Sequence, residues 1–178
     1  RRRDIACVII EPIQAEGGDN HFRPSFLQAL QRLAREHECL FLVDEVQTGV
    51  GLTGRMWAHE HFGLQPDVLA FGKKTQVCGI LAGPRVDEEP QNVFKVGSRI
   101  NSTWGGGLTD MVRFGRFLEV IEEERLVENA RVVGERLRRG RGPHAVAARD
   151  VLRVGLVDDV HGHDVHRAHL VDALGDPV

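Results

Sequence analysis

The sequence lacks long apolar runs, has few cysteines and carries little net charge, and each of these absences excludes a class of protein. No stretch approaches the ~18 consecutive apolar residues that a membrane-spanning helix needs, so we expect no membrane partner. Three cysteines, far apart in 178 residues, exclude a disulfide framework and fit a reducing cytoplasm. A net charge of −3 gives no reason to expect a nucleic-acid partner.

The amino terminus also lacks an initiator methionine and a secretory signal, since Arg1–Arg3 leads almost directly into a strand-like segment. We therefore expect a cytoplasmic chain that was cut from a longer one. Its composition, with 42% apolar and 28% charged residues, is that of an ordinary globular domain. At this length one domain can bury a core of its own.

Alternating apolar and helical patterns fill the first seventy residues. Three continuous apolar runs predict strands that are buried on both faces: residues 5–10, 40–43 and 68–71. Two helices are expected between them, one that begins at Pro24 and a short one over 56–62 that ends at Gly63. This order predicts an α/β fold with a parallel sheet. Two amphipathic helices are expected farther on, over about 108–121 and 126–139.

Three residues that can carry chemistry fall at the ends of the predicted strands. Glu11, Asp44 and Lys73 each lie at or just past the carboxyl end of a strand, where parallel sheets bind ligands. Burial at this place would favour a neutral Lys73 amine, which a Schiff base requires. Asp44 is placed to pair with a cationic ring nitrogen such as that of pyridoxal phosphate. An ordinary surface loop is the alternative for each residue.

A nucleotide-binding site is a second alternative, because an Asp-Glu pair after four hydrophobic residues also fits the Walker B pattern of ATPases. That site needs a Gly-x-x-x-x-Gly-Lys-Ser/Thr loop, normally upstream. The segment Gly72-Lys73-Lys74-Thr75 lacks the leading glycine spacing and lies downstream. The sequence therefore disfavours an ATPase.

Four features in a row carry a family resemblance: Phe-Leu-Val-Asp-Glu-Val-Gln-Thr-Gly over 41–49, Gly54, Asp-Val-Leu-Ala-Phe-Gly-Lys over 67–73, and Gly79. Together they resemble the signature of class III pyridoxal-phosphate aminotransferases. Within that family, segments 11–19, 72–79 and 101–106 are similar to the enzymes that act on the ε-amino group of lysine. The resemblance covers about residues 4 to 138, and it implies part of the large domain of a fold type I transferase, with a mostly parallel sheet and flanking helices.

The resemblance implies a role in holding pyridoxal 5′-phosphate for four residues near the strand ends. Lys73 would form the Schiff base with the cofactor and act as the catalytic base. Asp44 would pair with the pyridine nitrogen, Val46 would pack on the ring face, and Gln47 would bond the phenolic oxygen. These roles define the candidate catalytic and cofactor-binding residues.

Two further residues acquire roles only through the resemblance. Thr103 would reach the phosphate of the cofactor in a neighbouring subunit, which makes a homodimer the expected assembly. Glu16 would be a switch residue that binds substrate: it pairs with an arginine when the ε-amine of lysine is presented, and it moves away for the carboxylate of 2-oxoglutarate.

The implied reaction transfers the ε-amino group of L-lysine to 2-oxoglutarate and gives 2-aminoadipate 6-semialdehyde and glutamate. Enzymes for ornithine or 4-aminobutyrate share the core signature, so they remain alternatives. The family's phosphate-binding loop, its stacking aromatic residue and its carboxylate-binding arginine have no counterpart in this sequence. A non-catalytic fragment is therefore a third alternative, and we expect the isolated chain to be inactive.

The last forty residues read differently from the rest. Residues 1–139 are interpreted as a partial cofactor-binding domain, whereas residues 140–178 align with nothing in the family and are interpreted as a disordered or frame-shifted tail, with one strand expected over 151–157. A metal site is one interpretation of the tail histidines. A solvated polar tail is the other, and because the sequence favours it we expect no metal. These histidines are His161, His163, His166 and His169.

Overall fold

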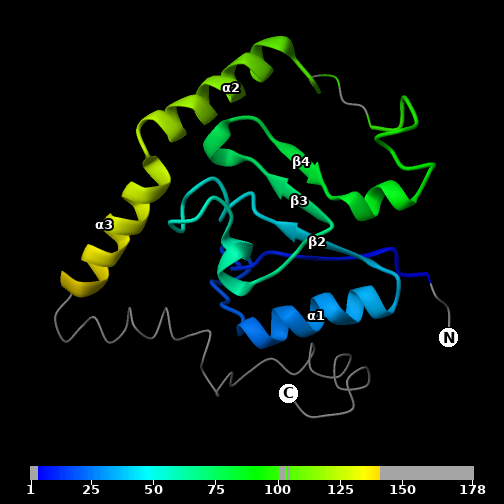
Figure 1. Cartoon of the computed structure of the whole chain (residues 1–178), viewed down its shortest axis with the longest axis horizontal. Coiled ribbons are helices and arrows are strands. Elements are labelled where there is room, and N and C mark those ends of the chain that lie inside the picture. Colours follow the sequence, from blue (N-terminus) through cyan, green and yellow to red (C-terminus); the bar gives the residue numbers. More distant parts are fainter. Residues whose placement is uncertain (1–3, 101–102, 104, 141–178) are drawn as a thin grey trace.

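A four-stranded sheet forms the centre of the computed structural model, which describes residues 4–100, 103 and 105–140 (Figure 1). The strands lie side by side in the order β1 (Cys7–Ile10), β2 (Leu40–Asp44), β3 (Val68–Phe71) and β4 (Gly79–Ala82). β1, β2 and β3 run parallel, as predicted, whereas β4 runs antiparallel to β3 and was not predicted. The predicted strand over 151–157 and the tail histidines lie outside the described residues.

Three α-helices and three short 3₁₀ helices complete the described part. The α-helices are α1 (Pro24–Glu36), α2 (Leu108–Glu123) and α3 (Leu126–Gly140), and the 3₁₀ helices are η1 (Ala58–Phe62), η2 (Lys73–Thr75) and η3 (Pro84–Glu88). The short helix predicted over 56–62 is thus η1, and Gly63 ends it with a φ of 64°, as expected of a glycine cap. Across the described residues, each helix is too short or too polar to cross a bilayer.

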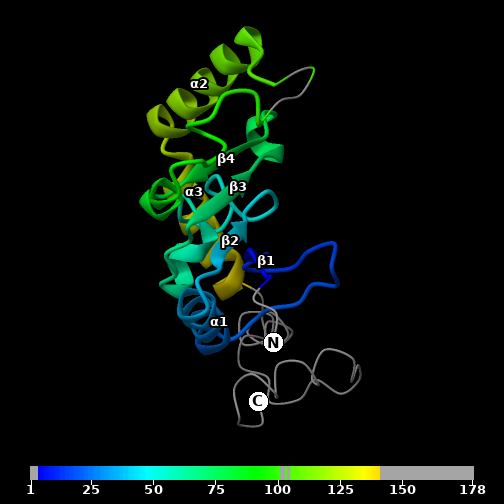
Figure 2. The same ribbon diagram turned by 90° about the vertical axis from the view of Figure 1, so that its right-hand side faces the viewer.

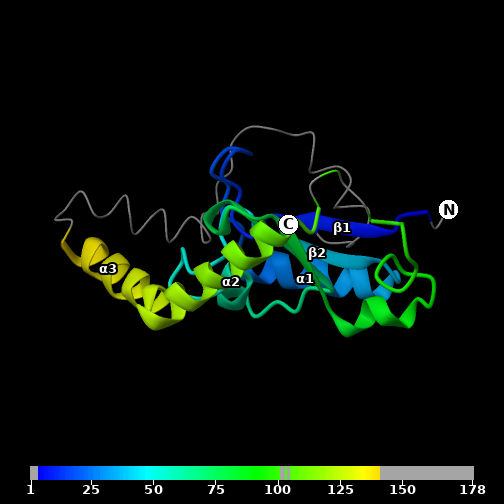
Figure 3. The same ribbon diagram turned by 90° about the horizontal axis from the view of Figure 1, so that it is seen from above.

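The core lies between α1 and one face of the parallel strands. Pro24 begins α1 without needing a free N–H there, and Leu27 on its inner face is completely buried. Phe41 and Val43 of β2 point to the same side and are also completely buried. Figure 3 shows α1 running alongside β1 and β2. Because side chains alternate along a strand, this helix covers only one of the two faces.

Burial of the first strand on both faces was predicted, and this prediction is wrong. Val8 and Ile10 pack against the core, but Ile9 points the other way and is 63% exposed. The reason is that, within the described ranges, no element covers the second face of β1. The helices α2 and α3 follow the predicted spacing, yet all their side chains are half-buried or exposed. Figure 2 shows α2 beside the β3–β4 end of the sheet and α1 beside the β1–β2 end.

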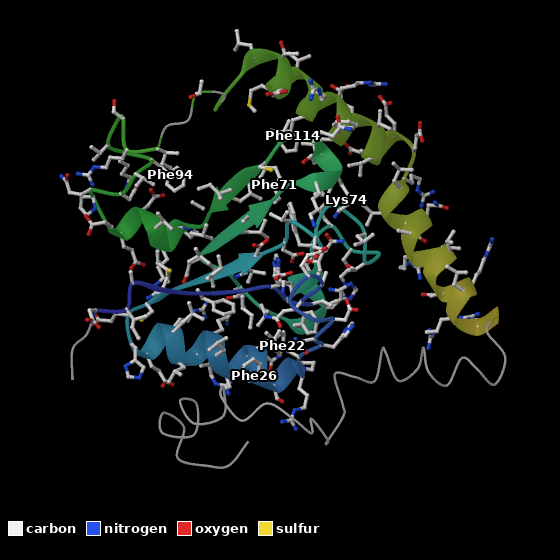
Figure 4. All side chains as sticks on the ribbon, turned by 180° about the vertical axis from the view of Figure 1, so that it is seen from behind. Phe22, Phe26, Phe71, Lys74, Phe94 and Phe114 are labelled. Atoms are coloured by element: carbon white, nitrogen blue, oxygen red, sulfur yellow. The ribbon has the colours of Figure 1, made fainter. Side chains whose placement is uncertain are left out.

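An aromatic stack joins α2 to the sheet. The ring of Phe71 on β3 stacks on Phe114 of α2 at a centroid distance of 5.3 Å (Figure 4). The centroid of the Trp57 ring lies 6.1 Å from that of Phe71. Gly79 is the strand partner of Phe71, and a Cβ at Gly79 would lie 2.5 Å from the tip of that ring. The absence of a side chain at Gly79 is therefore what lets the stack form.

We expect Gly79→Ala to lower the free energy of unfolding by about 1–3 kcal/mol, the usual effect of overpacking a tight site. The Phe71 ring cannot swing away easily because Trp57 and Phe114 flank it. Urea unfolding followed by circular dichroism measures the change. Gly115→Ala on α2 is the matched control, since its new methyl group meets nothing within 4 Å and should stabilise the helix by about 0.5–1 kcal/mol. Equal effects of the two substitutions would contradict the packing argument.

Candidate functional site

The carboxyl ends of the three parallel strands bring the chemically active residues to one edge of the sheet. Glu11 follows β1, Asp44 is the last residue of β2, and Lys73 lies two residues beyond β3. The register pairs Ile10 with Val43. It also pairs Asp44 with Ala70, so the ends are level. This arrangement follows from the parallel order of the strands.

Hydrogen bonds within the turn after β2, and from this turn to β3, fix its position. The carboxylate of Asp44 accepts a hydrogen bond from the N–H of Val46 at 3.0 Å. The N–H of Glu45 donates to the carbonyl oxygen of Ala70 on β3, and the N–H of Gly49 donates back to the carbonyl of Glu45, each at 2.8 Å. The turn therefore has a defined position relative to β3.

A completely buried carboxylate lies beneath this turn. One oxygen of Glu45 accepts hydrogen bonds from the Thr48 hydroxyl at 2.6 Å and from the N–H of Ala58 at 2.9 Å. The other accepts from the backbone N–H of His59 at 2.7 Å and lies 3.0 Å from its ring Nδ1, a bond that requires the proton on Nδ1. Three of these four donors, from Ala58 and His59, connect the turn to the start of η1.

These donors set the charge state of Glu45. Burial by itself raises the pKa of this carboxyl, but the hydrogen bonds from His59, Thr48 and Ala58 outweigh burial. The pKa of Glu45 therefore lies below its ordinary value of 4.5, and the side chain is an anion at neutral pH.

Gln47, on the same turn, is bonded by two adjacent lysines. The Nζ of Lys73 donates to the side-chain oxygen of Gln47, and the Nζ of Lys74 donates to its backbone carbonyl at 2.7 Å. The burial that was expected at Lys73 is wrong, because this residue lies in an exposed position beyond the end of β3. Its backbone is left-handed with a φ of 54°, which is uncommon for a residue with a side chain. Thr75 anchors the same short helix, since it is completely buried and its hydroxyl donates to the carbonyl of Val77 at 2.7 Å.

Lys74 is half-buried, and its surroundings act on its charge in both directions. Burial lowers the pKa of Lys74, the nearby charge of Lys73 lowers it further, and the carboxylate of Glu45 partly opposes these effects. In Figure 4 the Lys74 side chain lies near the carboxyl end of β3.

Not all of the residues singled out in the sequence come together. Asp44, Val46, Gln47 and Lys73 form one cluster, whereas Glu16 and Thr103 lie in separate exposed turns. Among residues 4–100, 103 and 105–140, no hydrogen bond or ion pair connects those two to the cluster. The sequence did not indicate a role for Glu45 or Lys74. Each follows a residue that was singled out, but the partners of Glu45 lie up to 14 residues away and those of Lys74 lie 27 residues away.

Comparison with known proteins gives concordant matches. Residues 1–155 match the family model of class III aminotransferases. The L-lysine-epsilon aminotransferase of Mycobacterium tuberculosis is 60% identical over 138 residues, which are 78% of this chain and 31% of that protein. The enzyme of that name from Streptomyces clavuligerus is 58% identical over 136 residues, 76% of this chain and 30% of the relative.

A solved structure agrees with these matches. Lysine aminotransferase from M. tuberculosis in the internal aldimine form superposes with a TM-score of 0.73 at 56% identity, and the match covers 86% of this chain and 33% of that one. The present chain therefore spans about a third of the length of the relatives that it matches.

Replacing Glu45 with glutamine should lower the free energy of unfolding by about 1–3 kcal/mol, because the new amide nitrogen leaves buried donors without an acceptor. The folded pKa of Glu45 is lower than its unfolded value, so its carboxylate stabilises the fold fully above about pH 4.5. The difference between wild type and variant should shrink as the pH falls below that value. Denaturant unfolding at several pH values tests this.

Glu119→Gln, which changes an exposed carboxylate bonded to Arg116, is the control for that experiment. It should leave the free energy of unfolding nearly unchanged at every pH, since exposed ion pairs contribute little. A Glu45→Gln protein as stable as the control variant at neutral pH would contradict the role assigned to the buried carboxylate.

Proposed function

The chain belongs to the class III aminotransferase family, and from this premise we propose that it supplies part of the pyridoxal-phosphate site of an enzyme that transfers the ε-amino group of L-lysine to 2-oxoglutarate. The observation that carries the proposal is the cluster at the sheet edge, where the amine of Lys73 meets the amide of Gln47 on the turn that follows Asp44. The relatives at 60% and 58% identity, which bear the name L-lysine-epsilon aminotransferase, support the choice of substrate.

The donor set of this cluster fits pyridoxal phosphate. The cofactor needs an amine for its aldehyde carbon, an acid for its ring nitrogen and a polar group for its phenolic oxygen. Lys73 offers the amine, Asp44 the carboxylate and Gln47 the amide. The N–H of Val46 holds one carboxylate oxygen of Asp44 at 3.0 Å, which fixes the orientation of that group.

Each residue of the cluster would do a defined task. When bound, pyridoxal phosphate supplies an electron sink for the carbon next to the amine nitrogen. Lys73 would hold the cofactor through Nζ, and after the substrate amine displaces it, Lys73 would move the proton of the substrate's ε-carbon. Asp44 would hold the proton of the ring nitrogen, Val46 would pack against the ring face, and Gln47 would orient the phenolic oxygen.

Glu16 would select between the two substrates. Its carboxylate would pair with an arginine while the ε-amine of lysine is presented, and it would withdraw when 2-oxoglutarate brings a carboxylate to the same place. The exposed turn that carries Glu16 supports this role, because there the charge can change partners without being buried. The products would be 2-aminoadipate 6-semialdehyde and glutamate.

The proposed assembly is a homodimer in the cytoplasm. Thr103 would reach the phosphate of the cofactor in the partner subunit, and its position in an exposed turn supports this. Leu108 and Val112, which follow on α2, are 84% and 74% exposed and would suit burial against another surface. Cys7, Cys39 and Cys78 are free, which suits a reducing compartment.

Incubation with pyridoxal 5′-phosphate followed by borohydride should leave a covalent adduct on Lys73, which peptide mapping by mass spectrometry can locate. The mapping is simple because the chain has only three lysines. Lys73→Ala should abolish the adduct, and Lys95→Met, which removes an exposed lysine paired with Asp87, should retain it. An adduct confined to Lys74 or Lys95 would contradict the proposal.

In the full-length protein, kcat/KM for L-lysine should exceed that for L-ornithine by at least about tenfold, the discrimination that one methylene group provides. 4-Aminobutyrate should be a poorer donor still, since it lacks the α-amino and α-carboxylate arrangement of lysine. Coupled detection of glutamate formed from 2-oxoglutarate measures all three. A preference for ornithine or 4-aminobutyrate would assign the protein to another activity within the family.

A further inference from the structure

Two adjacent lysines contact the same glutamine at different atoms, and only one of them has a task in the proposed chemistry. Lys73 Nζ donates to the side-chain oxygen of Gln47, while Lys74 Nζ donates to its backbone carbonyl at 2.7 Å. The first contact competes with any other partner that the Lys73 amine takes. The second is to the main chain, so it can persist throughout.

The surroundings of Lys74 indicate that this ammonium is held in place. The side chain is half-buried, and a cation that leaves water there needs compensation. The carbonyl of Gln47 provides one partner, and the buried carboxylate of Glu45 attracts the charge from below the turn. The short helix that carries both lysines is anchored at Thr75, whose side chain is completely buried.

Gln47 depends on this contact for its position. The turn that carries it is fixed at Asp44, Glu45 and Gly49 by hydrogen bonds from the main chain. Gln47 itself is held from the β3 side by the two lysines. If Lys73 is engaged elsewhere, Lys74 is the lysine that still connects Gln47 to the segment after β3.

We propose that Lys74 is a positioning residue, which fixes Gln47 through its backbone carbonyl so that the glutamine amide keeps its place when the Lys73 amine exchanges partners. This rests on the proposed function, in which Lys73 binds and releases the cofactor aldehyde. Lys74 touches neither the cofactor nor the substrate in this role. Its effect on the turn passes through the hydrogen bond to the backbone carbonyl of Gln47.

Three variants of the full-length protein test this role: Lys74→Met removes the ammonium at similar length, Lys74→Arg retains a cationic donor, and Lys95→Met is the matched control. Hydrogen–deuterium exchange of the peptide over 44–50 reports the turn directly. Exchange there should quicken by about tenfold in Lys74→Met, as expected for loss of one charged hydrogen bond. It should stay within about twofold of wild type in Lys74→Arg and Lys95→Met, while β1, β2 and β3 should exchange at the wild-type rate in all variants.

Capture of pyridoxal 5′-phosphate provides the second measurement. The concentration for half-maximal borohydride labelling of Lys73 should rise by about fivefold in Lys74→Met and be restored by Lys74→Arg, because a displaced Gln47 amide no longer orients the ligand.

Unchanged exchange in the turn, unchanged labelling, a general loosening of the sheet strands, or failure of arginine to restore either value would each overturn the positioning role. A wild-type protein that gives no Lys73 adduct would overturn the proposed function, and this role with it. A wild-type adduct that is insensitive to Lys74→Met would overturn this role alone.

Discussion

The arrangement at the sheet edge depends on one buried carboxylate. Glu45 is completely buried, and its side chain collects four donors from Thr48, Ala58 and His59. A charge in that place is tolerable only because every donor is in position. The side chain of Glu45 connects the turn after β2 to η1, and its backbone N–H connects the same turn to β3. These bonds fix the position in which Gln47 meets the two lysines.

Glycine makes this turn possible at its far end. A Cβ at Gly49 would lie 2.7 Å from the Trp57 ring and 2.8 Å from the carbonyl oxygen of Glu45, so any larger residue would force the turn open. Trp57 also lies near Phe71, which stacks on Phe114 of α2. The polar cluster and the aromatic stack therefore share a neighbour, and the position of one constrains the other.

The sequence predicted the elements whose signals are local. The apolar runs at 40–43 and 68–71 and the helix that begins at Pro24 were found because their periodicity and end signals lie within the elements themselves. β4 was not predicted, since its four residues become a strand by pairing with β3. Glu45 and Lys74 were missed for the same reason: their partners are distant in sequence. The exposure of one face of β1 could not be predicted from its apolar run, because exposure depends on which elements pack against that face.

The two outer helices differ from the sheet in how their order is maintained. α2 has 16 residues and α3 has 15, and neither has a buried side chain. Helices of this length are marginal in water when little packs against them. α2 is held to the sheet by the stacking of Phe114 on Phe71. On heating, α2 and α3 should therefore unfold before the sheet and α1 do. A single melting temperature would then describe only the unfolding of the sheet and α1.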